Sequence, residues 1–138
     1  MELEQCLNFV LTRAQQSVHQ LFKAELAPLG VTPGQYGILR CLWDENGQTA
    51  KQMAERLCLD GSTVTGILDR LEQKGLIKKQ TDPKDRRALR VVLTKEGKAL
   101  EKPIDQAIIS ANIKALEKFN DEQSKSLKEL LHELGVEK

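Results

Sequence analysis

The sequence predicts a mainly α-helical protein with one small β-hairpin, and three observations support this fold class. Apolar residues recur at steps of three and four along most of the chain, which is the period of a helix with one buried face. Two apolar runs of strand length, Leu76 to Gln80 and Leu89 to Leu93, flank the turn-forming segment TDPKDRRA. Two short helical patterns lie between Thr49 and Gly75, directly before the hairpin. Helix, turn, helix and hairpin in this order predict a winged helix-turn-helix head.

The first of these short helices begins at Thr49, where Thr49 and Gln52 form a capping-box pattern. Residues 58–61 then interrupt the helical period, and Asp60 can accept hydrogen bonds from the free amides of the next helix. Gly75 is placed to end that second helix. We therefore expect a tight turn between two helices.

The second short helix separates an apolar face from a polar one. Its apolar face consists of Val64, Ile67, Leu68 and Leu71, at i, i+3, i+4 and i+7. The polar face begins with small residues, and those that could approach a major groove are Ser62, Thr63, Thr65 and Gly66. Small side chains let a helix backbone come close enough for hydroxyls to reach base edges or phosphates. An ordinary solvated helix would show the same pattern, so this helix alone leaves both interpretations open.

Positive charge is concentrated around the hairpin, although the whole chain carries a net charge of only +1. From Arg70 to Lys98 there are ten Lys or Arg against four Asp or Glu, whereas the flanking parts are both acidic. A polyanion-binding surface requires such a local excess. We expect Arg70, Lys78 and Lys84 to favour phosphates.

The hairpin also carries a family resemblance. The run DPKDRRALRVVLTKEG, preceded by STVTGILDRLEQKGLI, resembles the winged-helix core of the MarR family of bacterial transcription regulators. The resemblance extends more loosely from about Leu3 to Gly135, and its most specific part is Asp85-Arg86-Arg87, an Asp-x-Arg element before a strand ending in Leu-Thr. It implies binding to double-stranded DNA, with Arg87 in the minor groove and Asp85 orienting it. An extended guanidinium suits a narrow, electronegative groove, and Arg86 is the second expected wing contact. The alternative for Asp85 and Arg87 is a surface ion pair in a turn.

The bulk properties are those of one small cytoplasmic domain. The length of 138 residues suits a single domain, with a winged-helix head at about 32–98. Neither a run of 18 apolar residues nor a signal-peptide pattern occurs, so we expect no membrane contact. The two histidines, His19 and His132, are far apart, and no catalytic or metal-binding motif is present. We therefore expect neither an enzyme nor a cofactor.

The terminal helices hold more apolar residues than this head needs for its own core. We predict dimerisation helices at about 1–30 and 99–136, because a second copy is the economical partner for this surplus. A two-fold homodimer would place its recognition helices about 34 Å apart and read a pseudo-palindromic operator. Pro103 either lies in the first turn of a C-terminal helix, leaving 95–102 as a separate turn, or kinks that helix.

The sequence leaves three interpretations of the function open. The first is a ligand-responsive repressor whose small apolar or aromatic effector binds where the dimer helices meet the head, since we expect few charged groups there. The second is a redox-responsive regulator that uses Cys6 or Cys58, although the peroxide-sensing position of the resembled family falls on Asn8. A winged-helix protein-interaction module without DNA binding is the third, and the basic hairpin argues against it.

Overall fold

The computed structural model describes residues 1–85 and 87–135 and confirms the mainly helical fold class with its hairpin. The N-terminal part contains η1 (Leu3–Gln5), α1 (Leu7–Leu26) and η2 (Ala27–Leu29). The central part contains α2 (Pro33–Asp44), β1 (Gln48–Thr49), α3 (Ala50–Leu57), α4 (Gly61–Gln73), β2 (Ile77–Thr81) and β3 (Leu89–Leu93). The C-terminal part contains α5 (Lys95–Ala99), α6 (Glu101–Ala115) and α7 (Asp121–Gly135).

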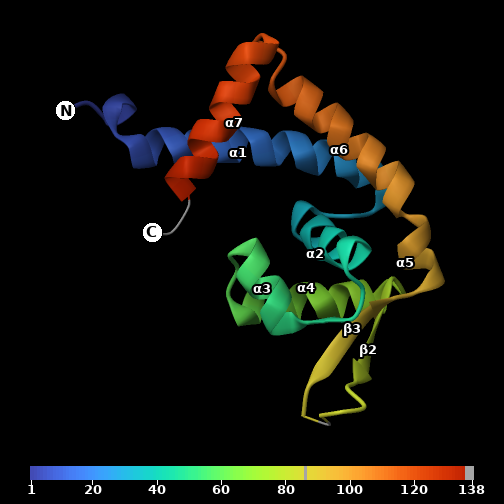
Figure 1. Cartoon of the computed structure of the whole chain (residues 1–138). Coiled ribbons are helices and arrows are strands. Elements are labelled where there is room, and N and C mark those ends of the chain that lie inside the picture. The colour runs from blue at the N-terminus through green and yellow to red at the C-terminus, as the bar shows by residue number, and fades with distance from the viewer. Residues whose placement is uncertain (86, 136–138) are drawn as a thin grey trace.

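The elements fall into a head and a set of arms, as Figure 1 shows. Helices α2, α3 and α4 and the small sheet form the head, from which the hairpin of β2 and β3 projects as the wing. Helices α1 and α6 pack side by side at the opposite end and form the arms together with α7. α4 and the wing therefore occupy the end of the molecule that is farthest from the arms.

Local sequence signals set most of the helix boundaries. Side-chain caps occur at the two predicted positions, Thr49 and Asp60, and also at Thr32, Thr94 and Asn120. α4 ends as the glycine predicts, because Gly75 has a φ of 76° and the amide of Leu76 donates to the carbonyl of Leu71. Pro103 lies in the first turn of α6, so α5 is a separate short helix.

Two details differ from the predicted elements. The first long helix is interrupted at Cys6, whose extended backbone separates η1 from α1. The hairpin gains a third strand, β1, which pairs antiparallel with β3 and gives the order β1-β3-β2. β1 has only two residues, which is too short for any periodic signal in the sequence.

One continuous core joins the head to the arms. It contains Leu26 from α1, Ile38, Leu39 and Leu42 from α2, Met53, Val64 and Leu71 from α3 and α4, Ile77 and Val91 from the sheet, and Ile104 from α6. Trp43 packs against this core, and its indole Nε1 donates to the carbonyl of Gly97 at 3.0 Å. The indole N–H is therefore satisfied by a backbone carbonyl of α5.

A charged network lies at the junction between α2 and α6, where we expected few charged groups from the sequence. The guanidinium of Arg40 donates to Asp105 Oδ1 and to Glu101 Oε2, each at 2.7 Å. Its Cζ also lies 5.0 Å from the centre of the Trp43 ring. That expectation was wrong because α2 and α6 bring together charges that are more than 60 positions apart in the sequence.

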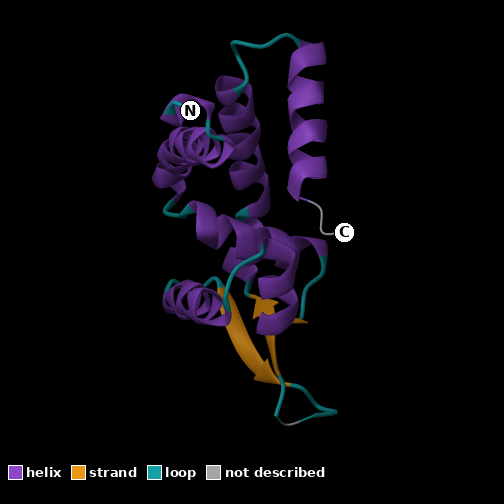
Figure 2. Ribbon diagram, turned by 90° about the vertical axis from the view of Figure 1, so that its left-hand side faces the viewer, coloured by secondary structure: helices purple, strands orange, loops and turns teal. Residues whose placement is uncertain are grey.

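The arms expose many large apolar side chains in the single chain. These side chains come from Leu3, Leu7, Val10, Val18, Ile109, Ile113, Phe119, Leu127, Leu130, Leu131 and Leu134. α7 has no buried residue and lies to one side of α1 and α6, as Figure 2 shows. The surplus apolar surface that the sequence indicates is therefore present and uncovered.

The close approach of α5 to Leu76, the residue before β2, provides a test of the fold. A Cβ added to Gly97 would lie 2.2 Å from the carbonyl oxygen of Leu76, which is backbone and cannot move aside cheaply. Gly97→Ala should therefore destabilise the protein by about 1–3 kcal/mol, as overpacking of a core does. Urea unfolding at a fixed protein concentration measures this loss.

Gly66→Ala is the matched control, because a Cβ at Gly66 meets no atom within 4 Å. Alanine in an exposed helix position should leave stability unchanged or raise it by up to about 1 kcal/mol. Equal unfolding midpoints for the two variants would contradict the packing described for Gly97.

Candidate nucleic-acid interface

The candidate recognition helix is α4, and its orientation follows from the face that it buries. Val64 and Leu71 are fully buried and Leu68 nearly so, while Ile67 packs against the same core. The predicted groove-facing residues are all exposed on the other side: Ser62, Thr63, Thr65 and Gly66. Gly66 faces open space, so the helix backbone itself is accessible there.

Asp60 organises the first turn of this helix. Its Oδ1 accepts from the backbone amide of Thr63 and from the hydroxyl of Ser62, each at 2.7 Å. These hydrogen bonds hold the pKa of the Asp60 carboxyl at about 2, below its ordinary 3.8, and the one from the Ser62 hydroxyl contributes most. The hydroxyl of Thr65 donates to the carbonyl of Gly61 at 2.9 Å. Both hydroxyl protons therefore stay within the protein, while the oxygens can still accept.

Asp82 holds the wing at its base, although in the sequence it is marked only as part of the turn-forming segment. Asp82 is 8% exposed, and its Oδ1 accepts from the backbone amide of Lys84 at 2.8 Å. Its Oδ2 accepts from Arg90 Nε at 2.9 Å, and Arg90 Nη1 donates to the carbonyl of Gly47 at 3.0 Å. The hydrogen bond from Lys84, followed by that from Arg90, lowers the pKa of Asp82. Asp82 and Arg90 thus tie the wing to the loop before β1.

The tip of the wing presents Arg87 to solvent. Its side chain is 97% exposed, and its backbone amide donates to Asp85 Oδ1 at 3.0 Å. The same oxygen lies 3.9 Å from Arg87 Nε, so Asp85 adjoins the guanidinium as the resemblance implies. Arg86, the other predicted wing contact, lies outside the described residues.

The basic residues of this region divide into two groups. Arg70, Lys78 and Lys84 are exposed, as their predicted role requires. In contrast, Lys79 Nζ pairs with Asp69 at 2.5 Å and Glu72 at 3.6 Å, and Arg90 pairs with Asp82. The local charge excess therefore overstates the number of cations that can reach a ligand. No sequence pattern marked Lys79 and Arg90 as paired, because strand pairing and helix packing bring their partners close.

Other chemistry finds little support in the described parts of the chain. No group of three His, Cys, Asp or Glu residues that could hold a metal ion occurs among residues 1–85 and 87–135. Within the same ranges, no helix has the length and apolar character needed to cross a membrane. The three cysteines are free thiols, with Cys6 half-buried, Cys41 buried and Cys58 exposed. Burial raises the pKa of the Cys41 thiol.

Comparison with known proteins identifies the family. Residues 31–89 match the family model described as MarR family. The organic hydroperoxide resistance transcriptional regulator of Bacillus subtilis is 37% identical over 135 residues, which cover 97% of this chain and 90% of the relative. The chain belongs to the MarR family.

Solved structures of MarR-type regulators share the fold over nearly the whole chain. The transcriptional repressor CouR bound to a 23-mer DNA duplex is 26% identical and superposes with a TM-score of 0.91, covering 98% of this chain and 96% of CouR. PcaV from Streptomyces coelicolor, in complex with its natural ligand, is 26% identical with a TM-score of 0.87, covering 97% and 94%. The prediction of a winged helix-turn-helix transcriptional regulator is confirmed.

The cap of α4 gives a pH-dependent prediction for this MarR family member. Because the folded pKa of Asp60 is depressed to about 2, its capping contribution is present above the unfolded value of about 3.9 and is lost only as the pH falls towards 2. The NMR carboxyl signal of Asp60 should therefore hardly titrate between pH 7 and about pH 3. Ser62→Ala should raise the midpoint towards 3.8, whereas Ser126→Ala on α7 should leave it unchanged. A midpoint near 4 in the wild-type protein would exclude this cap.

Proposed function

We propose that this chain is a ligand-responsive repressor that binds a pseudo-palindromic operator as a homodimer. One observation carries the proposal: the exposed start of α4, with its small side chains, lies next to a wing whose tip exposes Arg87 to solvent. Thr65 of α4 and Leu89 of β3 line the same small cavity, so the two elements are direct neighbours. Both lie at the end of the molecule away from the arms, where a duplex can approach (Figure 1).

Each group of exposed residues suits one part of a duplex. We assign Ser62, Thr63, Thr65 and Gly66 to the approach of α4 into the major groove, because their side chains are small and accessible. Arg70, Lys78 and Lys84 would contact phosphates. Arg87 would enter the minor groove with Asp85 orienting it, and Arg86 would be a second wing contact. CouR, whose fold this chain shares, is bound to duplex DNA in its structure.

The homodimer would form through the arms. Ile113 is 65% exposed and Leu130 is 63% exposed in the single chain, which is unfavourable for apolar side chains unless a partner covers them. A second copy offers the same surface, and two-fold symmetry would face the two α4 helices towards successive turns of one duplex. The head at about 32–98 and the dimerisation helices at about 1–30 and 99–136 remain a proposed division.

The proposed effector site lies where the arms meet the head. Solved relatives support a small molecule in general, because PcaV is described with its natural ligand and a MarR family protein of Mycobacterium tuberculosis, 25% identical, is described with salicylic acid. The Arg40 guanidinium at the junction of α2 and α6 is already paired with Glu101 and Asp105, so it does not favour an anionic effector, and a small apolar or aromatic molecule stays the proposed effector. A ligand there would shift DNA affinity only by its differential affinity for the two arrangements of the heads.

We do not propose a hydroperoxide response for this chain, although the Bacillus relative is named for one. The resemblance places the sensing position at Asn8, which carries no thiol. The thiols present are Cys6 between η1 and α1, Cys41 on α2 and Cys58 in the turn after α3.

Selection of bound fragments from the host genome tests the main proposal. Enrichment of a near-palindromic sequence, with affinity that falls as salt rises, supports it, and the absence of any enriched fragment contradicts it.

The wing assignment predicts the effect of one substitution. Arg87→Ala removes an exposed guanidinium that makes no packing contact with the core, so the thermal unfolding midpoint should not change. Operator binding should weaken by about 1–3 kcal/mol, measured by fluorescence anisotropy. Lys125→Ala on α7, which also removes one exposed cation, is the control. Equal operator affinity for the Arg87→Ala and wild-type proteins would refute the wing contact.

The dimer surface predicts a second effect. Leu130→Ser should leave the fold of each chain intact, because the side chain is largely exposed before association. Each dimer would lose two buried leucines, so its dissociation constant should rise by roughly 100-fold or more, as expected from about 1.5 kcal/mol for each side chain. Sedimentation velocity across a dilution series measures this change. Glu129→Ser is the control, and a wild-type protein that sediments as a monomer at micromolar concentration would contradict the dimer.

A further inference from the structure

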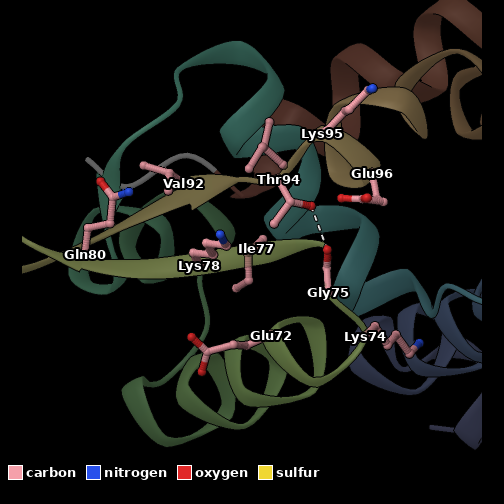
Figure 3. A pocket seen from close by; sticks show the side chains of 11 residues that line it. Glu72, Lys74, Gly75, Ile77, Lys78, Gln80, Val92, Thr94, Lys95 and Glu96 are labelled. Atoms are coloured by element: carbon pink, nitrogen blue, oxygen red, sulfur yellow. Dashed lines mark hydrogen bonds between the residues drawn. The ribbon is translucent and has the colours of Figure 1, made fainter.

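Lys74 lies at the C-terminal end of α4, inside the basic stretch of the sequence, yet its charge is used within the protein. Its Nζ donates to the carbonyl of Gly30 at 2.6 Å and to Gln35 Oε1 at 2.7 Å. Both acceptors belong to the corner where the arm ends and the head begins, since Gly30 follows η2 and Gln35 is in the first turn of α2. Figure 3 shows the Lys74 side chain pointing away from Lys78 on β2. Both side chains are exposed, but the ammonium of Lys74 is engaged by these two acceptors.

The acceptor Gln35 is itself fixed in place. It is only 4% exposed, and its Oε1 also accepts from the backbone amide of Thr32, the N-cap of α2. The amide of Gln35 in turn donates to the Thr32 hydroxyl at 3.1 Å. Gln35 Oε1 therefore accepts two hydrogen bonds, one from the N-cap amide of α2 and one from the ammonium of Lys74. Such charge-assisted hydrogen bonds are stronger than neutral ones.

The same end of α4 is held on its other side by Thr94, the residue between β3 and α5. The hydroxyl of Thr94 donates to the carbonyl of Gly75 at 2.6 Å, the hydrogen bond drawn in Figure 3. The amide of Thr94 donates to the carbonyl of Leu76 at 3.0 Å. The C-terminal end of α4 is thus held between the wing on one side and the corner between arm and head on the other.

The position of the C-terminal end of α4 determines the direction of its N-terminal end, which carries the proposed groove-facing residues. α4 spans 13 residues, or about 20 Å, so a tilt of about 3° at its C-terminal end moves its first turn by about 1 Å. Ser62, Thr63 and Thr65 lie in that moving part. A shift of this size is enough to lengthen hydrogen bonds to base edges.

We propose that Lys74 is a positioning residue for DNA binding, which holds the C-terminal end of α4 against the Gly30–Gln35 corner, and that it does not contact phosphate. The proposal rests on the DNA-binding role proposed above. It also gives the arms a direct route to α4, because a displacement of the corner between η2 and α2 moves the two acceptors of Lys74.

The salt dependence of DNA binding distinguishes a lysine that contacts phosphate from a lysine that only positions α4. A lysine that neutralises a phosphate adds about 0.9 to the slope of log K against log salt, for each subunit that binds. Lys74→Met should therefore weaken binding of the selected operator fragment by about 3- to 10-fold without changing this slope. Lys78→Met and Lys84→Met are matched controls of the same chemistry, and each should reduce the slope. All measurements are made well below the unfolding midpoint of each variant, determined beforehand by circular dichroism.

A double-mutant cycle adds a second readout. If Lys74 acts through Gln35, the loss from Lys74→Met combined with Gln35→Met should be clearly smaller than the sum of the two single losses. A Lys74→Met slope that falls as far as that of Lys78→Met would overturn the proposal, as would an unchanged affinity or fully additive losses. Wild-type protein that binds no fragment at any salt concentration would overturn the proposed function together with this inference, and the wild-type measurement alone distinguishes that case.

Discussion

Burial of one face of α4 is the constraint on which the rest of the head depends. Val64, Leu68 and Leu71 enter a core that also contains Ile38 and Leu39 of α2 and Val91 of β3. α2 comes close to this face, since a Cβ at Gly34 would lie 3.2 Å from Ile67 Cδ1. Once this face is buried, the helical period leaves Ser62, Thr65 and Gly66 on the solvent side. The wing direction depends on the same core, because β3 contributes to it.

Charge in this protein has two separate uses. Some cations hold elements together: Lys74 joins α4 to the start of α2, Lys79 joins β2 to α4, and Arg90 joins β3 to the base of the wing. Others, such as Lys78 and Arg87, extend into solvent. Each of these three cations meets a carboxylate, an amide oxygen or a backbone carbonyl, so the folded head carries less unpaired positive charge than its composition indicates. Arg70, Lys78, Lys84 and Arg87 stay exposed on α4 and the wing.

The arms and the head are joined mainly through α2. Ile104 of α6 and Leu26 of α1 complete the core against α2, and Arg40 adds polar contacts to Glu101 and Asp105. α2 therefore lies between the apolar arm surface and the recognition helix. In a dimer built on the arms, the separation of the two heads would depend on how α2 sits on α6 and on the η2 corner. This arrangement provides a physical path from arm geometry to DNA affinity.

The sequence by itself determined the features that depend on neighbouring residues. Capping by Thr49 and Asp60, the helix end at Gly75, the turn between α3 and α4 and the hairpin strands all follow from patterns a few residues long. The Asp-x-Arg element and the MarR family were equally visible, since the motif is continuous in the chain. The surplus of apolar residues at both ends also follows from composition.

Only the tertiary structure decided which charges are free and which are paired. Lys74 and Gln35 are 39 positions apart, and Arg40 and Asp105 are 65 apart, so no local pattern could join them. The two-residue strand β1 and the role of Asp82 at the base of the wing likewise depend on the pairing of distant segments. Side chains of one charge type are equivalent in a sequence. Folding makes them different, because an ion pair requires a partner within about 4 Å and only packing of the helices and strands supplies one.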